Sequence, residues 1–221
     1  MGESGCGKTT FGRTLLGLEK AYAGRAIFDG KDLLSITHQE FRELKRRMQI
    51  IFQDPLSSLN PRMNVLDLVT EGLIEFKLLE GSKEEHAKAL MQDVGLEAGA
   101  IYRYPHEFSG GQRQRINIAR AISMKPDFIV CDEPVSALDV SVQAQVINLL
   151  EDLREKYDLS YLFISHDLSV VSHIADRVVV MNRGKIVEQG PTRDIINNPQ
   201  DPYTKELIAA VPVPGGKKKN K

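Results

Sequence analysis

The chain has 221 residues, of which 42% are hydrophobic and 27% are charged, and its formal net charge is −1. These values are typical of a soluble globular protein with one or two cores, and the near-neutral charge gives no reason to expect a nucleic-acid partner. We expect neither a membrane span nor a signal peptide. Two cysteines, Cys6 and Cys131, are too few for a zinc or iron–sulfur site and indicate a reducing cytosol.

A phosphate-binding loop is predicted at the start of the chain, which fits the pattern G-x-x-x-x-G-K-[ST]. Backbone N–H groups of such a loop point at phosphate oxygens, Lys8 supplies a cation, and the Thr9 hydroxyl can ligate Mg²⁺. A helix with an apolar stripe of Phe11, Leu15 and Leu18 is predicted to follow. The residues predicted to bind nucleotide here are Gly2, Glu3, Ser4, Gly5, Cys6, Gly7, Lys8, Thr9 and Thr10.

A strand normally leads into a loop of this kind, but only Met1 precedes it here. We therefore expect either an N-terminally truncated chain or a misplaced start codon.

Strand and helix patterns alternate along the rest of the chain, which predicts an α/β fold with a largely parallel sheet. Residues 57 to about 125 read as mostly helical, with a capping box at 82–85. A long helix is lined by Val142, Val146, Leu149, Leu150 and Leu153. The other expected elements are strands at 25–30, 49–52, 128–131 and 161–164, a hairpin over 178–188, a helix over 203–210 and a disordered tail from 212.

Two acids follow the apolar run at 128–131, where the end of a parallel strand faces a ligand crevice. Asp132 is placed to hold Mg²⁺ opposite Thr9. Glu133, one residue further, is the candidate general base for an attacking water. The alternative is an acidic turn without a functional role.

A second glycine motif begins another predicted helix, and its residues are Ser109, Gly110, Gly111 and Gln112. Ser109 and Gln112 have capping-box spacing, and the two glycines leave the helix N-terminus open to an anion. Since one nucleotide rarely needs two cradles in one chain, we expect this one to serve a nucleotide held by a neighbouring subunit.

These motifs together resemble the ATP-binding subunits of ABC transporters. Residues 108–112 resemble the family signature, with Phe108 where Leu is commoner, and residues 136–139 match the D-loop, which places Asp139 at the nucleotide. Gln53 matches the Q-loop glutamine, which contacts Mg²⁺ and the transmembrane partner in the family. His166, after the strand at 161–164, matches the switch histidine that contacts the γ-phosphate.

The resemblance implies a P-loop NTPase (RecA-like) fold with an inserted helical subdomain. The expected core covers 1–55 and 126–200, the helical subdomain 56–125, and a C-terminal helix with a basic tail 201–221. Residues 52–62 and 201–207 resemble segments of dipeptide and oligopeptide importers, and nickel and some sugar importers share them.

The family mechanism implies that ATP and Mg²⁺ bind between two head-to-tail subunits, with Glu133, His166 and Gln53 as the catalytic residues. Expected partners are integral membrane permease subunits, a second ATP-binding subunit and, indirectly, an external solute-binding protein, at the cytoplasmic face of the membrane. The transported solute and the choice between homodimer and heterodimer stay open.

The family also has residues before the loop, including an aromatic that stacks on adenine, so we expect the parent protein to be an ATPase and this fragment to be insoluble or inactive. Two rival functions are a soluble ABC-type ATPase without a permease and a P-loop kinase or GTPase. A single cassette without sustained heptads disfavours the first, and the absence of an N-K-x-D motif disfavours the second. A catalytically inactive docking fragment is a third alternative.

Overall fold

The computed structural model describes residues 1–210, so the tail predicted from 212 lies outside the described residues. The chain forms two compact units. The larger one is Thr9–Ile164, and the smaller one combines Met1–Lys8 with the chain from Ser165 onward. The predicted domain boundaries near 55, 125 and 200 do not coincide with these units, and that division stays a prediction.

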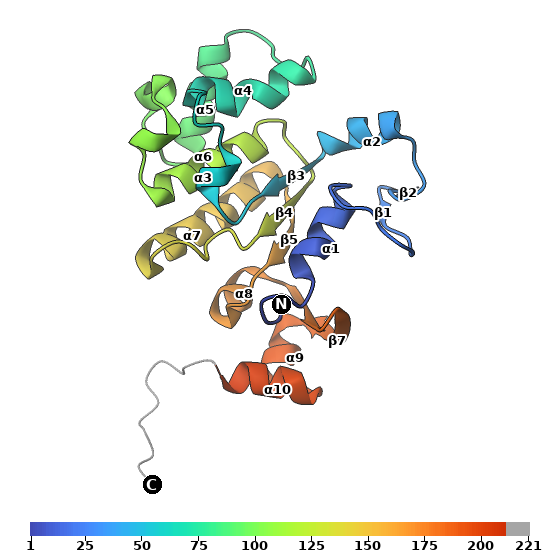
Figure 1. Cartoon of the computed structure of the whole chain (residues 1–221). Coiled ribbons are helices and arrows are strands. Elements are labelled where there is room, and N and C mark those ends of the chain that lie inside the picture. Colours follow the sequence, from blue (N-terminus) through green and yellow to red (C-terminus); the bar gives the residue numbers. More distant parts are fainter. Residues whose placement is uncertain (211–221) are drawn as a thin grey trace. The chain divides into compact units, whose positions relative to one another are not determined.

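A parallel three-stranded sheet forms the centre of the larger unit, in the order β3-β4-β5 (Figure 1). Its strands are β3 (Met48–Ile51), β4 (Phe128–Asp132) and β5 (Ser160–Ile164). The continuous apolar run at β4 is buried, as such a run predicts for a central strand. The strand predicted at 161–164 is confirmed as β5, which is an edge strand of this sheet and is mostly half-buried.

One face of the sheet is covered by α1 (Lys8–Leu15), the helix that follows the phosphate loop. The predicted stripe is wrong, since Phe11 and Leu18 are about half exposed and Leu16 is buried instead. The reason is a close approach at Gly12. A Cβ there would lie 2.9 Å from Ile164 Cδ1 and 3.0 Å from Val130 Cγ1, so the glycine turns this side of the helix to the sheet.

The opposite face of the sheet is covered by α7 (Val140–Tyr157). Successive side chains of a strand point to opposite faces, so Tyr161 points away from the face that carries Leu162 and Ile164. Its hydroxyl donates to the Leu150 carbonyl of α7 at 2.9 Å. The predicted apolar side of this helix is confirmed from Val146 to Leu153.

The predicted helical stretch is confirmed, and Figure 1 shows its helices gathered together within the larger unit. They are α3 (Pro55–Ser58), α4 (Val65–Glu75), α5 (Lys83–Asp93), the 3₁₀ turns η1 (Ala98–Tyr102) and η2 (Pro105–Glu107), and α6 (Gly110–Ile122). Ser82 caps α5 by accepting from the Glu85 N–H. Gly95 has φ +67°, which suits the turn that ends this helix.

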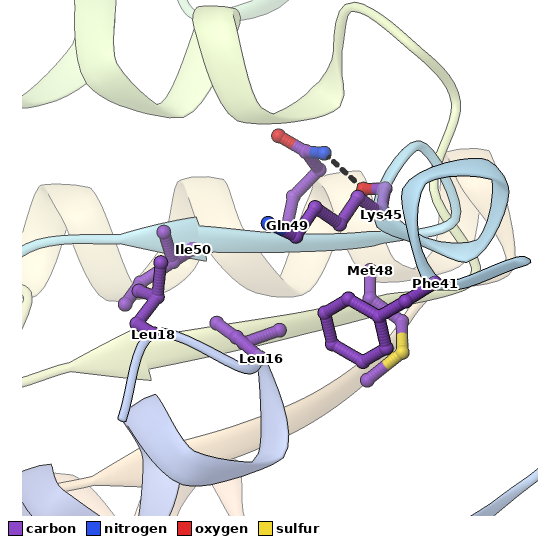
Figure 2. Close-up of a pocket in the computed structure, with 7 residues that line it drawn as sticks. All are labelled: Leu16, Leu18, Phe41, Lys45, Met48, Gln49 and Ile50. Carbon is purple, nitrogen blue, oxygen red and sulfur yellow. Dashed lines mark hydrogen bonds between the residues drawn. The ribbon is translucent and has the colours of Figure 1, made fainter. Parts of the chain in front are cut away.

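The remaining elements of the larger unit are a short hairpin, β1 (Ile27–Phe28) with β2 (Lys31–Asp32), and α2 (His38–Lys45). The strand expected at 25–30 is therefore shorter than predicted. A small pocket lies where α1, α2 and β3 meet (Figure 2). None of the predicted site residues lines it; its lining is Leu16, Leu18, Phe41, Lys45, Met48, Gln49 and Ile50.

The smaller unit is built on the predicted hairpin, β6 (Arg177–Asn182) with β7 (Lys185–Pro191). Its helices are α8 (Leu168–Ile174), α9 (Thr192–Asn197) and α10 (Pro202–Ala209). Val171, Val178, Val180 and Ile195 form its core. Among residues 1–210, no helix is long and apolar enough to cross a membrane.

Candidate functional site

The phosphate loop curls around the side chain of its own lysine. Lys8 is 6% exposed, and its Nζ donates to the carbonyls of Gly2 at 2.7 Å and Glu3 at 2.8 Å. Gly5 and Gly7 have φ +80° and +101°, which L side chains rarely adopt. The loop thus holds a desolvated cation at the N-terminus of α1, an arrangement that suits an anion.

Two contacts fasten this loop to the hairpin of the smaller unit. Met1 donates from its N-terminus to Val179 O and accepts from Met181 N at 2.8 Å, which is the hydrogen-bond pattern of a parallel strand pair beside β6. The Gly184 N–H donates to Cys6 O at 3.0 Å. Both contacts join backbone atoms and involve no side chain. The hairpin therefore helps to fix the backbone path of the phosphate loop.

The two residues predicted to share a magnesium ion lie together in the larger unit. The Thr9 hydroxyl donates to Asp132 Oδ1 at 2.8 Å, although the residues are 123 positions apart. Asp132 is 2% exposed at the end of β4. A hydroxyl and a carboxylate are oxygen donors of the kind that Mg²⁺ prefers. Thr10, the next residue of α1, is exposed.

The predicted base lies next to the predicted Q-loop glutamine. Gln53 Nε2 donates to Glu133 Oε2 at 3.2 Å, and the Glu133 N–H donates to Ile164 O at 3.0 Å. Glu133 also has φ +48°, a strained conformation for a residue with a side chain. Strain of this kind is common where a side chain must be aimed at a reacting group.

His166 is exposed and follows the end of β5 by two residues. It belongs to the smaller unit, whereas Asp132 and Glu133 belong to the larger one. Its predicted contact with a γ-phosphate stays a prediction.

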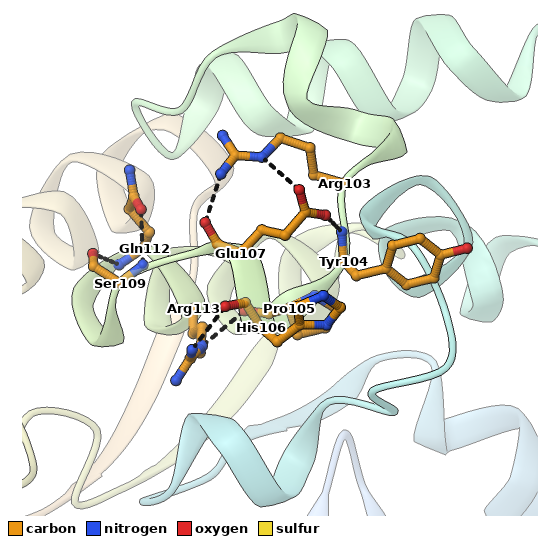
Figure 3. Close-up of polar contacts among 8 residues, drawn as sticks. All are labelled: Arg103, Tyr104, Pro105, His106, Glu107, Ser109, Gln112 and Arg113. Atoms are coloured by element: carbon orange, nitrogen blue, oxygen red, sulfur yellow. Dashed lines mark hydrogen bonds and ion pairs between the residues drawn. The ribbon is translucent and has the colours of Figure 1, made fainter.

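The predicted signature segment, Ser109–Gln112, starts α6 with a complete capping box (Figure 3). Ser109 Oγ accepts from the Gln112 N–H at 3.3 Å, and Gln112 Oε1 accepts from the Ser109 N–H at 2.9 Å. The N–H groups of Gly110 and Gly111 begin the helix, where no intrahelical acceptor is available to them. They are the donors that this segment can offer to an anion.

The segment just before the signature is held by three charged residues for which the sequence analysis predicted no such role (Figure 3). Glu107 Oε2 accepts from the Tyr104 N–H at 2.6 Å, and Arg113 Nε donates to Pro105 O at 2.8 Å. The Arg103 guanidinium lies 4.6 Å from the centre of the Phe108 ring. The role of Glu107 could have been predicted from the Pro-His-Glu sequence. This spacing lets the carboxylate reach back to the start of a helical turn.

Asp139 caps α7 in this structure. Its carboxylate accepts from the Ser141 hydroxyl at 2.7 Å and from the Val142 N–H at 3.0 Å. These hydrogen bonds, with that of Ser141 the largest cause, lower the pKa of Asp139. Its predicted contact with nucleotide stays a prediction.

Comparison with known families matches two parts of the chain. Residues 1–136 match the model of the family described as "ABC transporter". Residues 187–221 match the family described as "Oligopeptide/dipeptide transporter, C-terminal region". The first match contains the phosphate loop and the signature segment, and the second contains the end of β7, α9 and α10.

Among curated proteins, the oligopeptide transport ATP-binding protein OppF of Salmonella typhimurium is 54% identical over 216 residues. That match covers 97% of this chain and 65% of the relative, so the chain spans about two thirds of that protein's length. OppF of Bacillus subtilis is 51% identical over 217 residues, covering 97% of this chain and 71% of the relative.

Two solved structures have the same fold. A dimeric post-hydrolysis state of the ATP-binding cassette MJ0796 bound to ADP and Pi aligns with a TM-score of 0.76 at 28% identity, covering 87% of this chain and 84% of that one. The cbiO1 protein from Clostridium perfringens, part of the ABC transporter complex cbiONQ, aligns with a TM-score of 0.80 at 27% identity, covering 90% and 78%. The predicted P-loop NTPase fold is therefore confirmed, and the chain belongs to the ABC transporter family.

Proposed function

We propose that this protein binds and hydrolyses ATP as a subunit of an importer for di- or oligopeptides. The observation that carries the proposal is the pairing of Thr9 with Asp132 and of Gln53 with Glu133. These contacts support the proposal because Asp132, the oxygen donor paired with Thr9, ends β4 and Glu133, the candidate base, is the next residue. The two family matches and the oligopeptide-transport relatives support a role in peptide transport.

In this proposal each predicted site residue has a role in binding or hydrolysing ATP. The phosphate loop binds the nucleotide through its backbone N–H groups and Lys8, whose ammonium turns from the loop carbonyls to the phosphates. Thr9 and Asp132 would hold Mg²⁺, which neutralises charge on the phosphate oxygens when bound. Glu133 accepts the proton of the attacking water, Gln53 orients its carboxylate, and His166 contacts the γ-phosphate.

A second ATP-binding subunit completes the site in this proposal, with its own signature segment closing on the γ-phosphate. The exposed Gly110 and half-buried Gly111 fit this role because their N–H groups are unused by the helix. A dimeric state is also the form described for MJ0796 with ADP and Pi. ATP then favours the closed pair and hydrolysis releases it, which drives a membrane permease bound at the cytoplasmic face.

Replacing Glu133 tests this proposal most directly. In the full-length protein, Glu133→Gln should bind ATP and dimerise but turn over at least about 100-fold more slowly, because the amide cannot take the proton. Glu155→Gln is the matched control, since Glu155 is exposed on α7, and it should keep wild-type turnover. Phosphate release and size-exclusion chromatography with ATP measure the two properties.

Turnover at the wild-type rate in Glu133→Gln would reject Glu133 as the base. Uptake of a labelled tripeptide separates the importer from a soluble ATPase of the same family. Cells in which Glu133→Gln replaces the wild-type residue should lose uptake, and unchanged uptake would reject the transport function.

A further inference from the structure

A tyrosine of the C-terminal segment contacts the phosphate loop within the smaller unit. The Tyr203 hydroxyl accepts a hydrogen bond from the Glu3 N–H at 3.0 Å. The two residues are 200 positions apart, and each lies in a different one of the two segments matched by family models. The contact therefore joins a segment found across the ABC family to one that marks the peptide-transporter group.

Tyr203 is held in place by a helix cap, by hydrogen bonds to the residues before it and by packing of its ring. Asp201 caps α10 by accepting from the Tyr203 N–H at 2.8 Å. The Glu188 carboxylate on β7 accepts from the N–H groups of Gln200 at 2.8 Å and Asp201 at 3.1 Å, which fixes the chain just before the helix. The Tyr203 ring packs against the core of the smaller unit together with Leu207. The position of the hydroxyl is thus set by a strand, a helix cap and a core.

The hydrogen bond from Glu3 to Tyr203 lies in the part of the loop whose carbonyls bind Lys8. Glu3 donates its N–H to Tyr203, while the Glu3 and Gly2 carbonyls accept from Lys8 Nζ. Anchoring the Glu3 amide restrains a stretch next to Gly5, whose φ of +80° needs the conformational freedom of glycine. A loop already ordered before nucleotide arrives loses less conformational entropy on binding.

We propose that Tyr203 is a positioning residue whose hydroxyl preorganises the phosphate loop for nucleotide, so that the C-terminal segment tunes ATP affinity. The inference rests on the proposed ATP-binding function. Tyr203 bonds to the backbone of the loop and is not among the predicted catalytic residues, so the expected effect is on nucleotide binding.

The test is Tyr203→Phe in the full-length protein, which removes the hydroxyl and keeps the ring. One hydrogen bond at this exposed position predicts a KM for ATP raised about two- to tenfold, with kcat within about twofold of wild type. Without nucleotide, the Glu3 amide should exchange faster with solvent by a similar factor. Tyr22→Phe is the matched control, because Tyr22 is fully exposed, and it should change neither quantity.

Leu207→Ala separates packing from the hydrogen bond, since it weakens the same helix and keeps the hydroxyl. It should lower the unfolding midpoint, and it should raise the KM for ATP less than Tyr203→Phe does. Equal Glu3 exchange in Tyr203→Phe and wild type would overturn the inference whatever the turnover. Absence of ATP binding by the wild-type protein would instead reject the proposed function, so the two failures are distinguishable.

Discussion

The phosphate loop and the signature segment both place glycines at the start of a helix, but they differ in how they are held. The phosphate loop encloses Lys8 and is tied to a hairpin and to α10. The signature segment holds itself through the reciprocal bonds of Ser109 and Gln112, and both residues are exposed. Residues 109–112 contain no cation.

This difference indicates different tasks for two similar backbone motifs. A loop that encloses a desolvated ammonium can bind a phosphate chain by itself, since the charge and the donors come from one segment. An open helix N-terminus supplies only partial charge, which falls off within the first turn. It suits an anion that another molecule already holds, as the proposed dimer requires.

Of the substitutions that test this difference, removal of the enclosed Lys8 cation has the largest expected effect on ATP binding and turnover. Lys8→Ala should abolish measurable ATP binding and lower turnover at least about 100-fold, because the phosphates lose their cation in a site sheltered from water. Lys20→Ala is the control, since Lys20 is exposed, and it should bind ATP as the wild type does. Titration calorimetry with ATP measures both variants. Near-normal affinity in Lys8→Ala would show that the enclosed ammonium is not what makes this loop the stronger cradle.

Removing the cap of the signature segment should affect turnover and not binding. Ser109→Ala should lower turnover about tenfold and leave the ATP affinity of the isolated subunit within about twofold, since in the proposed dimer this segment serves the nucleotide of the neighbouring subunit. It should also cost about 1 kcal/mol of unfolding free energy, the usual value for a helix cap.

Ser82→Ala is the matched control for that stability loss. Ser82 caps α5 through the same type of bond, also at 3.3 Å, away from the predicted site. Urea unfolding should give similar losses for the two variants, and only Ser109→Ala should turn over slowly. Similar turnover in both would mean that the signature hydroxyl has no role beyond capping.

The strands and the pairing of Thr9 with Asp132 could be predicted because their signals are local. β3 and β4 lie in short, mostly apolar runs followed by polar residues. The phosphate-loop motif predicts Thr9 at the start of a helix, and the acidic pair predicts Asp132 at the end of a strand. The face of α1 could not be predicted from its hydropathy. The close approach at Gly12 depends on Val130 and Ile164, which lie far away in the sequence.

The contact of Tyr203 with Glu3 was beyond sequence analysis for a related reason. Its donor is a backbone N–H, which has no side-chain signature, and its acceptor lies 200 positions away. The capping role of Asp139 was not predicted, although its spacing to Val142 is that of an ordinary N-cap. The nucleotide contact that the D-loop resemblance implies stays a prediction.

Asp139 lies at the start of a third helix, α7, and its replacement has the smallest expected effect. The N-cap of α7 is a carboxylate, whereas the N-cap of α6 is the neutral Ser109. Hydrogen bonds from Ser141 and Val142 keep the pKa of Asp139 below its ordinary value. The pKa is therefore lower in the folded than in the unfolded chain. The stabilisation is fully present above the unfolded pKa of about 3.9 and is lost as pH falls through the folded pKa.

Asp139→Asn tests this assignment, because Asn also caps helices but does not titrate. The wild type should lose slightly more stability than Asp139→Asn between pH 5 and about pH 2, and Ser141→Ala should move the Asp139 pKa back toward about 3.9. Carboxylate NMR titration and acid unfolding measure the two effects. An unshifted Asp139 pKa would mean that its carboxylate does not occupy the N-terminus of α7 in solution. That helix start would then be open to an anion, as we propose for those of α1 and α6.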